Sequence, residues 1–313
     1  MVLNSPTKIV IATRESALAM WQAGHVAARL QAIYPGIHLE LLGMTTEGDR
    51  KLGTPLAALG GKGLFIKELE VALESGRADV AVHSMKDMPM NLPAGLTIAA
   101  ISEREDPRDA LVSNDYRDLE SMPPGSIVGT SSLRRETQLK ARCPHLRVEA
   151  LRGNVQTRLR MLDEGRYAGI ILAAAGLKRL GLSARITLIL EPAYSLPAVG
   201  QGALGIECRA ERQDLIDLLN PLDDADSRWC VEAERAFSRE LAGSCTVPLG
   251  GFAEITGTNA RLRGFVASVD GSRLLHDELT WPISRAPQEL GSAVAQRLIA
   301  RGAREILAGV HSS

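Results

Sequence analysis

Short apolar runs alternate with amphipathic stretches along the first two thirds of the chain. Apolar runs of this length predict buried strands, and a 3.6-residue spacing of apolar positions predicts helices. In the first part of the chain these are strands over 8–12, 37–42 and 78–82 and helices over 16–34 and 64–74. Pro35 and Gly76 follow the two helices, where helix ends are expected.

The same alternation continues beyond residue 95. The predicted elements are strands over 96–101, 109–113, 126–129, 146–150 and 169–173 and helices after Ser131 and Asn154. Strands that alternate with helices favour an open, mostly parallel α/β architecture. A charged stretch at 103–109 and a Pro/Gly-rich stretch at 191–202 interrupt the pattern and indicate hinges between paired lobes.

The order of elements changes after residue 223. The pattern there predicts a long helix over 226–241, strands near 249–255, 260–268 and 273–281, and a helix from about Ser284. This order is typical of a small α+β domain.

Composition narrows the class of protein. The chain has 313 residues, enough for two or three domains, with 45% hydrophobic residues and a formal net charge of −1. Near-neutrality argues against general binding to nucleic acid or to an anionic membrane. No uncharged run reaches the roughly 18 residues of a membrane-spanning helix, and the N-terminus lacks the pattern of a secretion signal. We therefore expect a cytoplasmic protein.

Several cofactor and metal sites are not supported. The histidines lack partners at metal-ligand spacing and the four cysteines form no CxxC pair, so no metal is predicted. Gly200-Gln-Gly-Ala-Leu-Gly205 matches a dinucleotide fingerprint, but a strand-like run at 203–208 follows it where the fingerprint requires a helix. We expect a hinge crossing there instead of a nicotinamide or flavin site.

Arginines gather at strand-to-helix turns. Residues 131–160 hold eight basic and two acidic side chains, a local net charge of +6. Arg134 and Arg135 follow one predicted strand, Arg152 and Arg158 follow the next, and Arg14 follows the first strand of the chain. Helix N-termini at such turns favour anions, and arginine binds carboxylates in bidentate fashion, so these residues predict a site for a substrate with several carboxylates. The alternative is that they lie on solvated faces.

Two further segments are candidates for chemistry. Lys86 and Asp87 follow the strand at 78–82, where a carboxylate could exchange protons or hold a developing positive charge, although a surface turn is an equal alternative. Cys245 lies in a loop of small residues and could serve as a nucleophile or attachment point, or pack as a small buried hydrophobe.

Together these segments resemble the porphobilinogen deaminase family, the hydroxymethylbilane synthases. The resemblance spans nearly the whole chain. It is carried by Ile11-Ala-Thr-Arg-Glu-Ser16, Gly60-Gly-Lys-Gly-Leu-Phe65, His83-Ser-Met-Lys-Asp87, Gly129-Thr-Ser-Ser-Leu-Arg-Arg135, Leu151-Arg-Gly-Asn154, Leu196-Pro-Ala-Val-Gly-Gln-Gly202 and the Cys245 loop.

The resemblance implies a fold and a reaction. The fold consists of two lobes like those of a type II periplasmic binding protein, each with a mostly parallel sheet, and a C-terminal α+β domain. The implied ranges are 1–103 with 203–222, 104–202 and 223–313. The reaction joins four porphobilinogen molecules head to tail, with release of ammonia, on a dipyrromethane cofactor, and hydrolysis then gives hydroxymethylbilane for tetrapyrrole and haem biosynthesis.

The resemblance also assigns residues. Asp87 is the implied catalytic carboxylate, and Cys245 is the implied thioether attachment of the cofactor. Further implied cofactor contacts are Lys86, Thr130, Ser131, Ser132, Arg134 and Arg135, and implied substrate contacts are Arg14, Ser16, Lys62, Phe65, Arg152 and Arg158. Glu47 and Ala58 stand where many relatives have basic residues, which puts in doubt a role of residues 47–62 in closing the site. The resemblance implies a monomer.

One alternative from another class stays open at this point. A non-enzymatic solute-binding protein for a polycarboxylate would also have two lobes and an arginine-rich site. The lack of an export signal and the presence of Cys245 argue against it.

Overall fold

The computed structural model describes residues 6–50, 66–241 and 247–309. The chain divides into two compact units, each of which has its own hydrophobic core. One unit comprises residues 1–105 with 203–228, and the other comprises residues 106–202 with 229–313.

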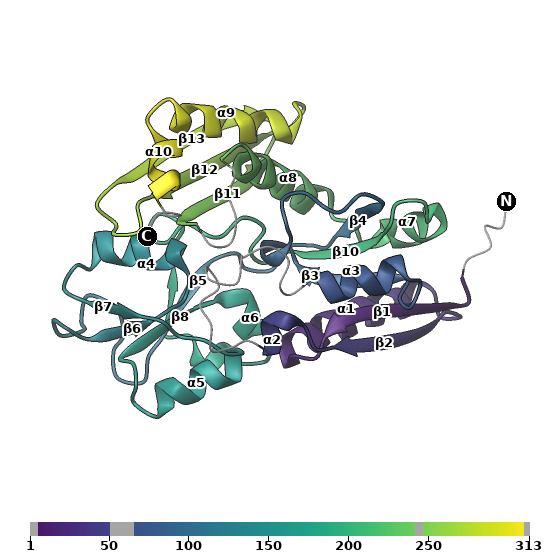
Figure 1. Ribbon diagram of the computed structural model, residues 1–313, viewed down its shortest axis with the longest axis horizontal. Helices are drawn as coiled ribbons and strands as arrows, with labels where there is room; N and C mark the ends of the chain where they lie inside the picture. The colour runs from purple at the N-terminus through teal and green to yellow at the C-terminus, as the bar shows by residue number, and fades with distance from the viewer. Residues whose placement is uncertain (1–5, 51–65, 242–246, 310–313) are drawn as a thin grey trace. The chain divides into compact units, whose positions relative to one another are not determined.

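The first unit is built on a five-stranded sheet with the order β2-β1-β3-β10-β4. Its strands are β1 (Lys8–Arg14), β2 (His38–Met44), β3 (Val80–Ser84), β4 (Leu96–Ile101) and β10 (Leu204–Arg209). Its helices are α1 (Ala17–Ile33), α2 (Glu47–Arg50), α3 (Lys67–Glu74) and α7 (Gln213–Leu219), with one-turn 3₁₀ helices η2 (Met85–Asp87) and η4 (Asn220–Leu222) (Figure 1). Only β10 runs antiparallel to both of its neighbours.

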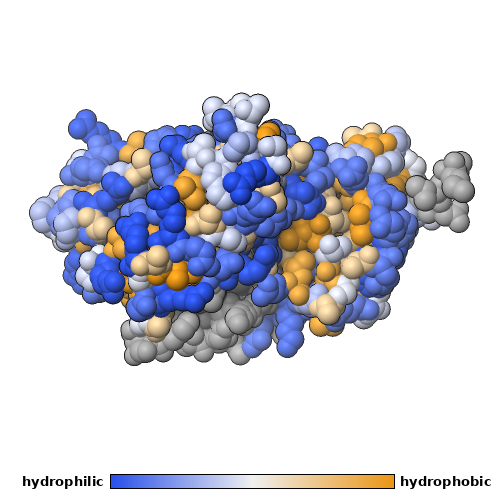
Figure 2. Space-filling model, turned by 90° about the horizontal axis from the view of Figure 1, so that it is seen from above, coloured by the Kyte–Doolittle hydropathy of each residue, from blue (hydrophilic) through white to orange (hydrophobic). Residues whose placement is uncertain are grey.

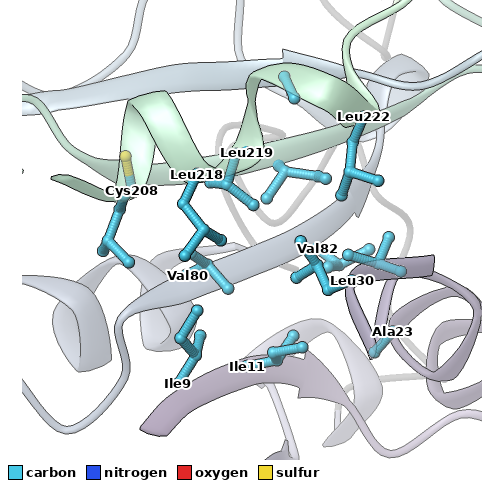
Figure 3. Packing of buried hydrophobic residues seen from close by; sticks show 14 of the residues in the cluster. Ile9, Ile11, Ala23, Leu30, Val80, Val82, Cys208, Leu218, Leu219 and Leu222 are labelled. Atoms are coloured by element: carbon cyan, nitrogen blue, oxygen red, sulfur yellow. The ribbon is translucent and has the colours of Figure 1, made fainter. Parts of the chain in front are cut away.

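Alternating side chains of this sheet fill two separate cores. Ile9, Ile11, Val80 and Val82 pack with α1 and α7, as Figure 3 shows. On the opposite face, Ala12 and Ala81 pack against Leu69 and Leu73 of α3. A strand alternates its side chains between the two faces, so a sheet covered on both sides requires apolar residues at successive positions, as the sequence pattern indicated.

The second unit begins with another five-stranded sheet, of order β7-β6-β8-β5-β9. Its strands are β5 (Asp109–Val112), β6 (Ile127–Gly129), β7 (Arg147–Glu149), β8 (Gly169–Ala173) and β9 (Leu188–Leu190). Its helices are α4 (Leu133–Arg142), α5 (Val155–Asp163) and α6 (Ala174–Arg179), with the 3₁₀ helix η3 (Ser183–Arg185). The reversed strand β5 occupies the same position in this order as β10 does in the first sheet, so the two lobes share one topology.

The rest of the second unit contains a three-stranded antiparallel sheet. Its strands are β11 (Leu249–Thr256), β12 (Asn259–Ala267) and β13 (Leu274–Pro282), accompanied by α9 (Pro287–Ile299), α10 (Ala303–Ala308) and α8 (Ala225–Glu240), whose residues 225–228 belong to the first unit. Phe237 of α8 is fully buried and lies against Gly251 and Gly264 of the sheet. The absence of side chains at these glycines gives the aromatic ring its space.

The surface is mainly hydrophilic on the face that Figure 2 shows, where hydrophobic residues lie in scattered groups. Within the described ranges, the only large hydrophobic side chains classed as exposed are Trp21, Ile33, Val71 and Leu188. The helices of this part of the chain include none with the length and apolar character needed to cross a membrane.

The predicted fold class is confirmed. Two mixed α/β sheets, each with four strands pointing one way and one reversed, precede an antiparallel sheet with helices. The helix predicted from Ser284 begins later, at Pro287, a favoured first position of a helix. The separation of residues 223–313 as a third domain stays a prediction.

Candidate active site

A pocket in the first unit lies where β1 and β3 end. These two strands are parallel neighbours, so their carboxyl ends meet at one edge of the sheet. The pocket has an empty volume of about 410 Å³ and is open to solvent. Its lining includes Arg14, Ser16, Gln22, His83, Ser84 and Asp87. Three of the residues predicted from sequence, Arg14, Ser16 and Asp87, are thus brought together here.

Arg14 is held in a fixed position at the last residue of β1. Its guanidinium group donates two hydrogen bonds to the carboxylate of Asp49, one of them 3.1 Å long from Nε to Oδ2. Burial opposes ionisation of Asp49, but hydrogen bonds from Arg14 and Thr46 outweigh it and hold the pKa of Asp49 below its usual value. Ser16 follows as the N-cap of α1, and its Oγ accepts a hydrogen bond from the amide of Ala19. An arginine and a helix N-terminus therefore line the same pocket.

Asp87 is presented to the pocket by a well-anchored turn. Met85 and Met88, on either side of it, are almost completely buried, and the amide of Met85 donates a 3.0 Å hydrogen bond to the carbonyl of Ala203. Gly205 leaves the space that the Met85 side chain fills, because a Cβ there would overlap the Met85 sulfur. Asp87 itself is exposed, and Lys86 beside it is half-buried. The packing fixes the backbone while the carboxylate stays accessible.

A buried pair that the sequence did not indicate lies at the wall of this pocket. Nε2 of His83 on β3 and Oε2 of Glu207 on β10 are 3.0 Å apart. The two side chains are 4% and 0% exposed. They lie 124 residues apart in the chain, so no local spacing joins them. The signal that could have found them is a glutamate within the apolar run of β10.

In the second unit, Arg134 and Arg135 converge on one aspartate. Asp109, the first residue of β5, accepts hydrogen bonds from both guanidinium groups, with shortest distances of 2.7 Å to each. All three side chains are at most 7% exposed. Ser195 and Gln201 also donate hydrogen bonds to Asp109. Neither arginine lies on a solvated face, which was the alternative considered from sequence.

This cluster carries a surplus of positive charge. Two guanidinium groups face one carboxylate, so the three side chains sum to +1 in a buried setting. Burial lowers the pKa of Arg134, and Arg135 lowers it further, whereas Asp109 opposes both effects. Arg134 and Arg135 lie in the first turn of helix α4, whose N-terminal end adds a partial positive charge. An anion is favoured at this end of the helix.

The neutral donors predicted at this turn have local partners. Thr130 is buried and its Oγ1 accepts a hydrogen bond from the amide of Ser132, the N-cap of α4. Ser131 Oγ donates a 2.8 Å hydrogen bond to the carbonyl of Leu151. Ser132 makes no side-chain capping bond within the helix.

Arg152 and Arg158 flank the start of α5 and are both half-buried. Nε of Arg158 donates a 2.8 Å hydrogen bond to the carbonyl of Gly153, whose φ of +104° is unfavourable for other residues. Asn154 caps the helix by accepting a hydrogen bond from the amide of Thr157. Both arginines are thus attached to the turn at which the sequence predicted them.

The remaining predicted residues, Lys62, Phe65 and Cys245, lie outside the described residues. Where the sequence suggested a glycine-rich hinge crossing instead of a dinucleotide site, Gly200 and Gly202 adopt positive φ values of +71° and +95°. Strand β10 begins two residues later, at Leu204. A strand therefore follows these glycines, so the helix N-terminus that would bind a pyrophosphate is not formed there.

Two family descriptions match consecutive parts of the chain. "Porphobilinogen deaminase, dipyromethane cofactor binding domain" matches residues 9–217, and "Porphobilinogen deaminase, C-terminal domain" matches residues 229–300. The chain belongs to the porphobilinogen deaminase family. This confirms the resemblance inferred from the motifs.

Curated porphobilinogen deaminases agree with the chain over almost its whole length. One from Methylobacillus flagellatus is 61% identical over 308 residues, which is 98% of this chain and 99% of the relative. One from Nitrosomonas europaea is 62% identical over 308 residues, which is 98% of this chain and 100% of the relative. Among solved structures, the methionine binding protein MetQ aligns with 71% of this chain and 93% of its own, at 13% identity and a TM-score of 0.46. Membership of the porphobilinogen deaminase family rests on the sequence matches alone.

Proposed function

We propose that this protein is a transferase that joins four porphobilinogen molecules head to tail, releases ammonia at each condensation and hydrolyses the product to hydroxymethylbilane. The observation that carries this function is the match of both family domains to one chain, together with a pocket that holds Asp87 and Arg14. A solute-binding protein for a polycarboxylate, the alternative open from sequence, is not favoured, because the curated relatives of near full length bear the enzyme's name.

The arginines at the predicted strand-to-helix turns bind the carboxylates of the substrate and product. Each porphobilinogen brings an acetate and a propionate group, so the number of carboxylates grows with every condensation. Arg14 and Ser16 provide a guanidinium group and a helix N-terminus at the pocket of the first unit. Arg152 and Arg158, at the start of α5, bind further carboxylates. Lys62 and Phe65 complete the proposed substrate contacts.

Asp87 stabilises the positive charge that develops when the substrate loses ammonia. Departure of the amine leaves an electron-poor methylene carbon attached to a pyrrole ring, and the positive charge extends to the ring nitrogen. A carboxylate fixed beside that ring lowers the energy of this state more than that of the bound substrate, which is the condition for catalysis. The buried methionines on either side of Asp87 hold the backbone from which its carboxylate reaches the pocket.

The chain binds a dipyrromethane cofactor, as its family domain is described. The donors around the start of α4 fit such a group, because the surplus charge of Arg134, Arg135 and Asp109 favours carboxylates. Lys86, Asp87, Thr130, Ser131 and Ser132 are the further proposed contacts. When bound, the cofactor supplies the pyrrole carbon to which the first substrate is joined. Cys245 is the proposed attachment through a thioether.

Intact-protein mass spectrometry tests the cofactor and its attachment together. We expect the native protein to exceed its sequence mass by one dipyrromethane and Cys245→Ala to lack this increment. Cys230→Ala is the matched control, because Cys230 is a buried helical cysteine and this variant should keep the increment. An active native protein with an unmodified mass would disprove the attachment.

Turnover of porphobilinogen tests the activity itself. We expect the purified protein to consume porphobilinogen, release ammonia and form hydroxymethylbilane, and Asp87→Ala to lose this activity while its unfolding curve is unchanged. A wild-type protein that binds porphobilinogen without consuming it would instead support the solute-binding alternative.

The enzyme acts as a monomer in the cytoplasm, without nucleic acid or membrane partners.

A further inference from the structure

The buried pair of His83 and Glu207 lies on neighbouring strands at the wall of the pocket. In the antiparallel register of β3 and β10, His83 is opposite Gly205 and Glu207 is opposite Ala81. Ala81 packs against α3, so His83 and Glu207, at alternate positions, share the face that α3 covers. His83 also lines the pocket together with Asp87, Arg14 and Ser16. His83 thus both contacts a buried carboxylate and belongs to the lining of the candidate active site.

The burial of Glu207 reduces the stability of the fold. Its side chain is completely buried, and its Oε1 has no hydrogen-bond partner among the described residues. Its Oε2 contacts His83. A buried carboxylate with so few partners generally stabilises a protein less than an apolar side chain of the same volume would. A feature that costs stability beside a pocket indicates a functional role.

The geometry fixes the tautomer of a neutral His83. An ionised carboxylate only accepts hydrogen bonds, so Nε2 carries the hydrogen and donates it to Glu207. Nδ1 then holds a free lone pair, and within the described part of the chain no hydrogen bond to Nδ1 is formed. A ring in this state is a base whose orientation is set by a buried carboxylate.

We propose that His83 is a further catalytic residue, which accepts at Nδ1 the proton released when two pyrrole rings are joined, and that Glu207 is its positioning residue. This proposal rests on the function proposed above. It assigns proton transfer to His83 and charge stabilisation to Asp87, so each group performs a single task.

The proton balance of one condensation is complete with these groups. The substrate enters with its aminomethyl group as an ammonium, and the C–N bond breaks with its electron pair on nitrogen, which gives ammonia. A carbon–carbon bond then forms to a ring carbon of the acceptor pyrrole. The C–H electron pair of that carbon returns to its ring, and the proton passes to Nδ1 of His83. Ammonia takes this proton and leaves as ammonium, which restores the neutral ring.

The charged groups around the pair favour this transient proton. Glu207 faces the ring from β10, and Glu70 and Glu74 belong to α3, which covers the same face. Burial raises the pKa of Glu70, and the negative charges of Glu207 and Glu74 raise it further, while His83 opposes this. On the pocket side, Asp87 adds a negative charge, whereas Arg14 is paired with Asp49. Acidic groups therefore lie on β10, on α3 and on the pocket side of the ring, while Arg209 of β10, two residues beyond Glu207, donates its hydrogen bond to the carbonyl of Leu73 on α3.

Two variants test the base and its positioning residue. We expect His83→Ala to lower kcat by about 10²–10⁴-fold, the usual contribution of a general base, and added imidazole to restore part of the rate through the space left by the ring. We expect Glu207→Leu, in protein that its unfolding curve shows to be folded, to lower kcat at least tenfold with little change in KM. The double variant should be no slower than His83→Ala, because Glu207 acts through the ring.

Matched controls and a spectroscopic measurement separate this role from a structural one. Glu40→Gln removes a carboxylate from strand β2 of the same sheet, which pairs with Lys8 and does not line the pocket, and its kcat should stay within twofold of the wild type. Ring ¹⁵N shifts of His83, measured without substrate, should show a protonated Nε2 and an unprotonated Nδ1 in the wild type and a mixture of tautomers in Glu207→Leu. A protonated Nδ1 in the wild type would overturn the proposal, as would a near-normal kcat in either His83→Ala or Glu207→Leu. Failure of the wild type to consume porphobilinogen would instead disprove the proposed function.

Discussion

Nη1 of Arg134 lies 2.7 Å from Oδ2 of Asp109, and both side chains are almost completely removed from solvent. The same arginine also donates a 2.6 Å hydrogen bond to the carbonyl of Leu196. Arg134 therefore connects Asp109, at the start of β5, with the segment that precedes Gly200. A single carboxylate thus holds the geometry of the turn that is the proposed cofactor contact.

The first prediction concerns the stability of this cluster. Asp109→Asn leaves two buried guanidinium groups without a counter-charge, and breaking a buried ion pair in this way costs about 3–5 kcal/mol. We expect the free energy of unfolding, measured in urea, to fall by about that amount, with loss of activity as a further consequence.

Asp163→Asn is the control for this variant. Asp163 also accepts a hydrogen bond from an arginine, Arg185, at 2.6 Å, but its side chain is 48% exposed. Solvent screening limits such a pair to about 0–1 kcal/mol. If the two variants lost similar amounts of stability, the burial of Asp109 would not be what makes its ion pairs important.

The second prediction concerns how the free energy of unfolding changes as the pH falls into the acid range. Burial disfavours the charged form of Asp109, but Arg134 and Arg135 outweigh it and hold the pKa of Asp109 far below its usual value. A lowered folded-state pKa contributes stability that is fully present above the unfolded-state value of about 3.9 and is lost as the pH falls below it. The difference in free energy of unfolding between wild type and Asp109→Asn should therefore shrink below about pH 4. A constant difference down to pH 3 would contradict the assigned ionisation.

Sequence patterns predicted the sheets and turns because these depend on local spacing. Apolar runs placed β1, β3 and β8 within one or two residues of their observed positions, and the caps Ser16 and Asn154 begin helices as expected. Short elements such as β9 and α6 were missed, since three or six residues carry too little periodicity. Local patterns also predicted the arginines that follow strands at the strand-to-helix turns.

The partners of these residues could not be predicted from sequence. Arg134 lies 25 residues from Asp109, and His83 lies 124 residues from Glu207. Each pair is formed by the order of strands in a sheet, which local spacing does not encode. For the same reason the sequence indicated that Arg134 and Arg135 bind anions, but not that a buried aspartate already holds them.

The third prediction concerns the small C-terminal sheet. A Cβ on Gly264 would lie 2.5 Å from ring atoms of Phe237, which is fully buried and has no room to move away. Overpacking of this kind costs about 1–3 kcal/mol. We expect Gly264→Ala to lower the free energy of unfolding by that amount, as measured in urea.

Gly24→Ala is the control for this variant: it makes the same chemical change, but we expect it to raise the free energy of unfolding. Gly24 lies inside helix α1, and a Cβ added to it would meet no neighbouring heavy atom within 4 Å. Alanine is favoured over glycine in a helix interior by about 0.5–1 kcal/mol, so this variant should be slightly more stable than the wild type. Destabilisation by both variants would show that the addition of a methyl group, rather than the Phe237 contact, determines the result.

The last prediction separates the charge of Asp87 from its shape. Asp87→Asn keeps the size of the side chain and the anchoring of the turn by Met85 and Met88, but removes the negative charge. If the carboxylate stabilises positive charge that exists only during the reaction, kcat should fall by about 10²–10³-fold while KM changes little. Single-turnover ammonia release measures this step directly. A rise in KM with unchanged kcat would mean that Asp87 binds the substrate equally well before and during the reaction, and its role would then be recognition.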